Sequence, residues 1–345
     1  QRQLNRREEA ECLVYLKVEN QLLERFTKKY TFRKKTSEGG FRDSLAGLIF
    51  VDKSKLPSGC GYPSVISVGR HEGRKHIYEG LDREQTVRIA LIPGRRPRQF
   101  SFDEKKTPGS TFCVVYPEGQ EKEMELYCRR IRQAVKAGAH FVFFSEYSIS
   151  PQMLEQIKTW LCDEHGKAWL KESSLLAVFA GTTWEEDAET EGHNNVMHVL
   201  NWRGTEVGTY NKYSPFTKMP TADAEDTYEM CEHLTNPGER ICLFDMEGMG
   251  RIVPAVCRDV IDDVLPRRLV EQFNPFLMMV TAYSSSVAMF KRTLESYASE
   301  FYVSSVLCNS CDAVRRVSNG DLDLCVVPEK VKTAMRAHIK VIRQC

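Results

Sequence analysis

The chain has 345 residues, enough for one large α/β domain with an extension, or for two domains. Hydrophobic residues make up 42% of it and charged residues 28%, which excludes collagen-like, low-complexity and wholly disordered proteins. The 48 Lys and Arg residues balance the 47 Asp and Glu residues, so the net charge of +1 gives no support for a polyanion-binding protein.

Residues 1–84 are expected to form an N-terminal extension made of one helix and short strands. Apolar side chains recur at helical spacing within residues 7–30, which predicts a helix there. Two short apolar runs bounded by Pro and Gly predict strands at 48–51 and 65–68. The basic motif GRRPR (94–98) is the best single indication of nucleic-acid binding, although a solvated surface explains it as well.

Residues 85–345 are expected to form the main domain, because strand and helix patterns alternate regularly from residue 87 onward. Strands are predicted at 87–93, 112–117, 141–146, 175–184, 196–202, 203–210, 241–257 (a pair), 276–283 and 302–309. Helices are predicted at 121–138, 151–162, 261–273 and 289–300, and a polar loop at 185–195. This order indicates a sheet-based α/β sandwich.

Three residues with reactive side chains stand where apolar runs stop. Glu146 closes FVFFSE, Lys212 lies in GTYNKYSPF, and Cys257 closes RIVPAVC. Ligands of open α/β sheets bind beyond the carboxyl ends of strands, so these residues are candidates for one site. A thiol is a weak nucleophile at neutral pH unless a base or a cation assists it, and a carboxylate and an ammonium group supply both.

The motifs around these residues resemble those of the carbon–nitrogen hydrolase (nitrilase) superfamily. The matching segments are AVKAGAHFVFFSE, then AGTTW and HNNVMHVLNWRGTEVGTYNK, and finally CRD, and the resemblance runs from about residue 87 to about 328. It implies an αββα sandwich and a Cys257–Glu146–Lys212 catalytic triad. It also implies a homodimer or higher homo-oligomer formed through helices such as 261–273, with no cofactor or metal.

Many members of that superfamily carry a second glutamate between the lysine and the cysteine. The candidates are Glu225, Glu229 and Glu232. The register of the superfamily favours Glu232, which lies 257 − 232 = 25 residues before the cysteine, and Glu229 is the fallback.

The 12 cysteines are spread through the chain, and most are expected to be small apolar core residues of a reduced, cytoplasmic protein. No apolar run approaches the length needed to span a bilayer, so no membrane partner is expected. Cys308 and Cys311 could join Cys325 and His338 around zinc, but one C-x-x-C pair without a second is a weak metal signal.

Two functions from different classes remain open. In the first, Cys257 attacks a small-molecule amide or nitrile, with Glu146 as general base and acid, and Lys212 and the N–H after Cys257 stabilise the oxyanion. Glu232 assists hydrolysis of the thioester. In the second, the chain serves assembly or sensing within a larger polypeptide, such as a bacterial reverse transcriptase–nitrilase antiviral fusion. A nucleic-acid partner is expected only in that second case.

Overall fold

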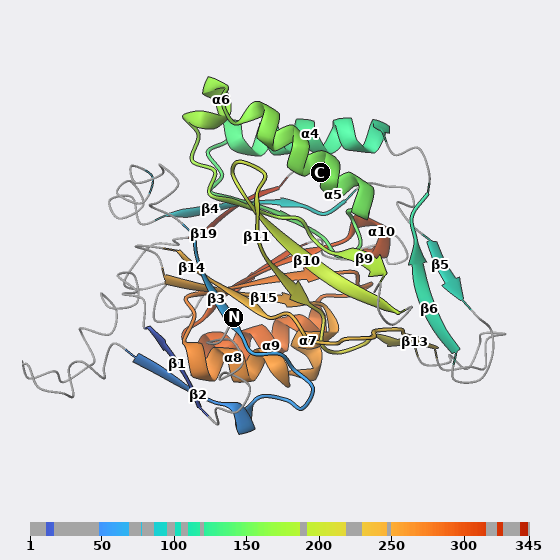
Figure 1. Cartoon of the computed structure of the whole chain (residues 1–345), viewed down its shortest axis with the longest axis vertical. Helices are drawn as coiled ribbons and strands as arrows, with labels where there is room; N and C mark the ends of the chain where they lie inside the picture. Colours follow the sequence, from blue (N-terminus) through green and yellow to red (C-terminus); the bar gives the residue numbers. More distant parts are fainter. Residues whose placement is uncertain are drawn as a thin grey trace, which may run out of the picture.

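The fold has four layers, in which two sheets pack face to face and helices cover the outer face of each (Figure 1). The computed structural model describes residues 12–16, 48–68, 77, 86–94, 101–104, 110–117, 121–186, 192–218, 230–246, 250–314, 323–326 and 339–343. The αββα sandwich expected from the sequence is confirmed.

The first sheet contains the strands that lead to Glu146 and Lys212. Its order is β11-β10-β8-β7-β4-β19, with β9 also paired to β10. The strands are β4 (Val87–Ile92), β7 (Phe141–Phe144), β8 (Ala177–Phe179), β9 (Thr183–Glu186), β10 (His193–Asn201), β11 (Glu206–Asn211) and β19 (Ile339–Arg343). The β19, β4, β7 and β8 strands are parallel, which explains why runs such as FVFF are apolar on both faces.

Three helices cover the outer face of the first sheet (Figure 1). They are α4 (Glu121–Lys136), α5 (Pro151–Glu164) and α6 (Ala168–Lys171), and their apolar sides form one cluster with Val142 and Phe144 of the sheet. The α5 helix begins where its sequence predicts, because the Ser150 side chain accepts from the Met153 N–H and Pro151 occupies the first turn.

The second sheet leads to Cys257, and its order is β18-β17-β16-β15-β14-β3. The strands are β3 (Ser64–Val68), β14 (Cys242–Met246), β15 (Gly250–Val256), β16 (Leu277–Ala282), β17 (Ser304–Asn309) and β18 (Asp323–Val326). Its outer face carries α7 (Arg258–Asp262), α8 (Leu265–Phe273) and α9 (Ala288–Glu300), and α10 (Cys311–Val314) follows β17. The main apolar core lies between the two sheets, where the Phe179 and Phe244 ring centroids are 5.7 Å apart.

A small third sheet stands at the side of the sandwich and carries Glu232 (Figure 1). It consists of β5 (Ser101–Glu104), β6 (Ser110–Val115), β12 (Thr217–Lys218) and β13 (Met230–Glu232), in the order β12-β13-β6-β5. The parallel pairing of β13 with β6 sets the Glu232 backbone opposite Phe112.

The N-terminal extension differs from its prediction. Residues Cys12–Leu16, expected within a helix, form the strand β1, which pairs antiparallel with β2 (Leu48–Asp52). CLVYL contains β-branched and aromatic residues, and pairing with LIFVD overrides the helical spacing. The short helix η1 (Lys53–Lys55) and strand β3 follow, and β3 pairs with β14, so part of the extension is built into the sandwich. The rest of residues 7–30 lies outside the described residues.

Two predicted elements are each divided in two by a residue with positive φ. The strand expected at 175–184 becomes β8 and β9 because Gly181 has φ 61°, and a Cβ there would approach the Ser145 carbonyl oxygen to 2.2 Å. The helix expected at 261–273 becomes α7 and α8 because Asp263 adopts a left-handed conformation. The predicted polar loop 185–195 is also wrong at both ends, since β9 and β10 pair there.

Four of the five residues of GRRPR lie outside the described residues. Within the described part of the chain, the structure contains no helix with both the length and the apolar character needed to cross a bilayer.

Candidate active site

Glu146, Lys212 and Cys257 converge where the two sheets face each other at the carboxyl ends of their strands. Glu146 lies two residues after β7, Lys212 directly follows β11, and Cys257 directly follows β15. Each is buried: 1% of Glu146, 1% of Lys212 and 5% of Cys257 is exposed. Glu146 is therefore not a surface carboxylate and Lys212 is not a solvated loop lysine, which each would more often be by itself.

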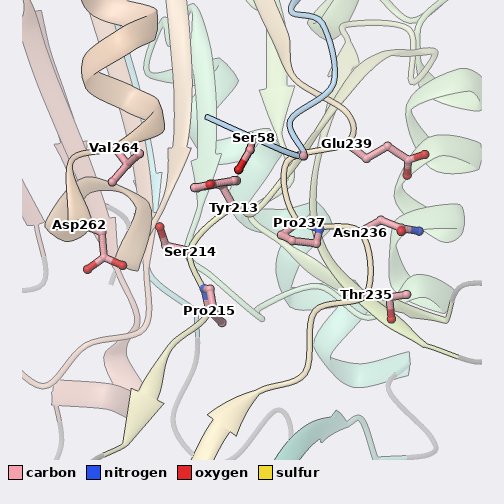
Figure 2. Close-up of a pocket in the computed structure, with 11 residues that line it drawn as sticks. Ser58, Tyr213, Ser214, Pro215, Thr235, Asn236, Pro237, Glu239, Asp262 and Val264 are labelled. Carbon is pink, nitrogen blue, oxygen red and sulfur yellow. The ribbon is translucent and has the colours of Figure 1, made fainter. Parts of the chain in front are cut away.

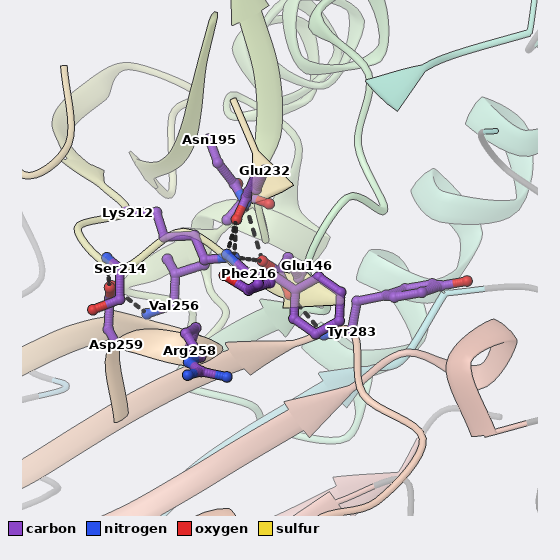
Figure 3. Close-up of polar contacts among 12 residues, drawn as sticks. Glu146, Asn195, Lys212, Ser214, Phe216, Glu232, Val256, Arg258, Asp259 and Tyr283 are labelled. Atoms are coloured by element: carbon purple, nitrogen blue, oxygen red, sulfur yellow. Dashed lines mark hydrogen bonds and ion pairs between the residues drawn. The ribbon is translucent and has the colours of Figure 1, made fainter. Parts of the chain in front are cut away.

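The charged side chains of the predicted site are in direct contact (Figure 3). Lys212 Nζ lies 3.0 Å from Glu146 Oε1 and 2.6 Å from Glu232 Oε2. The Cys257 thiol lies near enough to the Glu146 carboxylate that the carboxylate raises the pKa of the thiol. The structure thus brings together all four of the preferred site residues, while Glu225 and the fallback Glu229 lie outside the described residues.

Glu232 has its carboxylate occupied by four donors. Its Oε2 accepts from Lys212 Nζ and from the Phe216 N–H at 2.9 Å. Its Oε1 accepts from the Tyr147 hydroxyl at 2.5 Å and from Asn195 Nδ2 at 2.9 Å. A carboxylate offers about four lone-pair positions, so Glu232 is saturated and has no free position with which to activate a water molecule. Through these bonds Glu232 holds its neighbours in place, and its expected role in thioester hydrolysis stays a prediction.

The electrostatics favour a thiol beside a basic carboxylate. Burial raises the pKa of Cys257 well above its ordinary value, and the nearby Glu146 raises it further, while Lys212 opposes the shift. Burial also raises the pKa of Glu146, and Glu232 adds to this against the opposing charge of Lys212. For Lys212, burial lowers the pKa but the two glutamates raise it more strongly, so the ammonium form persists. Cys257 is thus a thiol that lies near a carboxylate of raised pKa.

Cys257 occupies a strained turn between β15 and α7. Its φ is 42° and its N–H donates to the Thr281 carbonyl at 2.7 Å. A positive φ in a residue other than glycine persists only where its surroundings hold it, and such strain concentrates at functional sites. The turn leaves the peptide N–H of Arg258 in the first turn of α7, where N–H groups lack an intrahelical acceptor.

Asp259, the acid of the CRD motif, ties the cysteine turn to the segment after Lys212. Its Oδ1 accepts from the Ser214 N–H at 2.6 Å (Figure 3). The same oxygen accepts from the Tyr213 N–H at 3.0 Å, and Oδ2 accepts from the Tyr210 hydroxyl at 3.1 Å. Burial raises the pKa of Asp259 to about 7, and the two N–H donors oppose that shift. The acid holds two catalytic segments together.

Asn195 is a site residue that sequence reasoning missed, because it was placed at the end of a polar loop. It lies in the buried part of β10, and its carbonyl accepts from the Lys212 N–H at 2.9 Å. The hairpin register therefore places Asn195 beside Lys212. A bulge between Val199 and Leu200 shifts this register by one residue, so counting outward from the turn would have paired Asn195 with Asn211 instead. The Tyr283 N–H, which donates to Glu146 Oε2 at 2.7 Å, was also missed, since no side-chain pattern reports a backbone donor.

A cavity of about 880 Å³ lies next to the loop that follows Lys212 (Figure 2). Its lining comes from residues 58–59, 213–215, 235–237, 239, 262 and 264. Ser214 lines it and also contacts Asp259, so the cavity adjoins the site, but the triad side chains are not part of its wall.

Ten of the eleven cysteines in the described segments form no disulfide bond. Cys242, Cys257 and Cys308 are buried, whereas Cys162 and Cys325 are exposed and the other five are half-buried, so fewer are core residues than expected. Cys113 is half-buried because its strand, β6, belongs to the small side sheet. Across the described ranges no three His, Cys, Asp or Glu side chains converge as metal ligands, and His338 lies outside those ranges.

Comparison with known proteins finds similarity in fold only. No protein-family model and no curated protein matches the sequence. Among solved structures, Nit3 of Saccharomyces cerevisiae, from branch 10 of the nitrilase superfamily, is 16% identical with a TM-score of 0.44 over 70% of this chain and 82% of that one. An amidase from Nesterenkonia sp. is 14% identical with a TM-score of 0.41 over 64% and 78%. A carbon–nitrogen hydrolase from Helicobacter pylori G27 is 13% identical with a TM-score of 0.38 over 67% and 82%.

Proposed function

We propose that this chain is a thiol hydrolase that cleaves a non-peptide C–N bond, with Cys257 as nucleophile and a small-molecule amide or nitrile as substrate. The observation that carries the proposal is the convergence at strand ends of a buried thiol and a buried carboxylate that is paired with a buried ammonium group. Thiol, base and cation are the three groups that acyl transfer through a thioester requires.

In the acylation step, the Cys257 thiol gives its proton to Glu146 while sulfur forms a bond to the amide carbon. The oxygen of the resulting tetrahedral intermediate is stabilised by the Lys212 ammonium and by the peptide N–H of Arg258. The C–N bond then breaks, and Glu146 returns the proton to the nitrogen, which leaves as ammonia or an amine. The raised pKa of Glu146 suits it to accept and then donate this proton.

In the deacylation step, water replaces the amine. Glu146 takes a proton from the water, hydroxide forms a bond to the thioester carbon, and the C–S bond breaks to release a carboxylic acid. The sulfur regains its proton from Glu146. Glu232 contributes by fixing Lys212, since its own oxygens are saturated.

Mass spectrometry of intact protein after exposure to fluoroacetamide, an electrophilic amide, tests the nucleophile. We expect one acetamide adduct in the parent and in Cys308→Ala, which removes another buried thiol. We expect none in Cys257→Ala, and labelling at least about 100-fold slower in Glu146→Gln because the base is lost. Equal labelling of Cys257→Ala and the parent would remove Cys257 as the nucleophile.

A panel of small amides and nitriles, assayed for ammonia release, tests the reaction itself. We expect at least one to be hydrolysed by the parent and by Cys308→Ala but not by Cys257→Ala. Full biological activity in Cys257→Ala would favour an assembly or sensing role over catalysis.

A further inference from the structure

Four buried side chains form a closed ring of hydrogen bonds around the base. Lys212 Nζ donates to Glu146 Oε1 and Glu232 Oε2, and Asn195 Nδ2 donates to Glu146 Oε1 at 3.0 Å and to Glu232 Oε1 at 2.9 Å (Figure 3). At most 2% of any of the four residues is exposed. Glu146 and Glu232 therefore accept hydrogen bonds from the same two donor groups, the Lys212 ammonium and the Asn195 amide.

The ring contains more negative than positive charge. Two carboxylates face one ammonium group in a site from which water is excluded, and like charges at such a distance favour protonation of one of them. Asn195 adds two N–H donors to this ring without adding a charge. Aspartate at the same position would place a third carboxyl group against the first two.

The orientation of the Asn195 amide is set by the two carboxylates. Both protons of Nδ2 have an acceptor, whereas the buried Oδ1 has no hydrogen-bond partner among the described residues. The reverse orientation would turn Oδ1 toward two carboxylate oxygens. The Asn195 carbonyl meanwhile accepts from the Lys212 N–H, so the strand register places both shared donors side by side.

We propose that Asn195 is the positioning residue of the base, holding Glu146 ionised and aimed at the Cys257 thiol by donating to Glu146 and Glu232 together. This inference rests on the proposed hydrolase function, in which Glu146 must be ionised to accept the thiol proton. Asn195 does not contact the reacting sulfur; it acts through the carboxylate.

The groups that face Glu146 come from five segments. They are Lys212 after β11, Glu232 of β13, Cys257 after β15, Tyr147 next in the chain, and Tyr116 after β6. Of these, Lys212 favours the ionised form and Glu232 opposes it. Removing the two Asn195 donors makes the ionised form of Glu146 less stable. The acidic limb of the pH–rate profile, where the rate rises as Glu146 ionises, should therefore move to higher pH.

The test is the rate of Cys257 labelling by fluoroacetamide between pH 4 and 9, measured by intact mass for Asn195→Asp and for a matched control, Asn194→Asp. The two substitutions are isosteric and lie one residue apart on β10. The structure uses the acceptor of Asn194, whose Oδ1 takes the Asn236 N–H at 2.9 Å, and aspartate retains that acceptor. At position 195 it is the amide Nδ2 that makes the hydrogen bonds, as a donor to both glutamates, and aspartate has no such donor.

We expect Asn195→Asp to label at least about tenfold more slowly than the parent on the acidic limb, with the limb displaced upward by about one pH unit. Asn194→Asp should follow the parent profile. Superimposable profiles for Asn195→Asp and the parent would overturn the inference, as would an equal displacement in the control.

If Asn195→Asp does not fold by near-UV circular dichroism, Asn195→Ala, which adds no charge, replaces it. An upward displacement of the limb in Asn195→Ala supports the inference, and an unchanged profile overturns it. Failure of the hydrolase function is distinguishable: the parent would then release no ammonia from any amide, while the labelling profiles could still be compared.

Discussion

The hydroxyl of Thr281 donates to the carbonyl of Phe144 at 3.0 Å, and this bond joins the two sheets beside the site. Phe144 ends β7 two residues before Glu146, and the Thr281 carbonyl accepts the Cys257 N–H at 2.7 Å. One fully buried threonine therefore contacts both the strand that carries the base and the turn that carries the nucleophile.

Replacing Thr281 by valine keeps the shape of the side chain and removes this bond. We expect a loss of about 1–2 kcal/mol in the free energy of unfolding, because a buried acceptor loses a donor. We also expect about tenfold slower Cys257 labelling, since small displacements of reacting groups are costly. Ser305→Ala is the control: Ser305 is equally buried, but its hydroxyl has no partner among the described residues. Urea unfolding that ranks Ser305→Ala as the more destabilised would contradict this account.

Neutralising Glu232 should displace the pH profile in the direction opposite to that of Asn195→Asp. The charge of Glu232 raises the pKa of Glu146, so Glu232→Gln should move the acidic limb of Cys257 labelling to lower pH by about one unit. The maximal rate should fall about tenfold, because Lys212 loses one of its two charged partners. Glu164→Gln, at a buried carboxylate on α5, should leave the profile unchanged. An upward displacement in Glu232→Gln would contradict the assigned charges.

Asp259 should make stability depend on pH near neutrality. Its folded pKa of about 7 lies above its ordinary value of 3.8, so its contribution is complete below about pH 4 and is lost as pH rises through 7. Asp259→Asn retains the acceptor for the Tyr213 and Ser214 N–H groups and cannot ionise. In urea unfolding, we expect the stability of the variant relative to the parent to rise between pH 4 and 8, by up to about 4 kcal/mol. A constant difference over that range would disprove the titration.

Two buried histidines should contribute to stability with opposite pH dependence. Burial lowers the pKa of His198, but its ring nitrogens lie 2.7 Å from Glu185 and 2.8 Å from Glu206, and these carboxylates raise it above the ordinary 6.5 overall. Burial, with Arg88, lowers the pKa of His140 to about 4. The His198 contribution is therefore present below pH 6.5 and lost as pH rises through its folded pKa. The His140 contribution is lost as pH falls from about 6.5 to 4.

Urea unfolding of His198→Gln and His140→Gln at several pH values checks this contrast. Relative to the parent, His198→Gln should be most destabilised near pH 6 and less so above pH 8. His140→Gln should be most destabilised above pH 7 and less so toward pH 4. The same trend with pH in both variants would contradict the assigned charge states.

The alternation of apolar runs and amphipathic helices was sufficient to predict an α/β sandwich and most element positions in residues 85–309, whereas the four-layer order came from the resemblance to a known superfamily. The order of Glu146, Lys212 and Cys257 at strand ends was sufficient to nominate them together, because the carboxyl ends of strands share one edge of a sheet. The wrong secondary-structure predictions lie where tertiary contacts or backbone conformation override the local sequence pattern. In β1 a pairing partner displaced the helical spacing, and at Gly181 and Asp263 a positive φ divided one predicted element into two.

The sequence by itself determined which chemical groups the site contains and the strand ends from which they come. Only the tertiary structure decided their ionisation and their roles, because both depend on burial and on partners distant in the chain. Glu232 is saturated by four donors from three segments, and Asn195 is a shared donor only because its strand register places it beside Lys212. The thiol of Cys257 is protonated because folding removes it from water and sets it against a carboxylate.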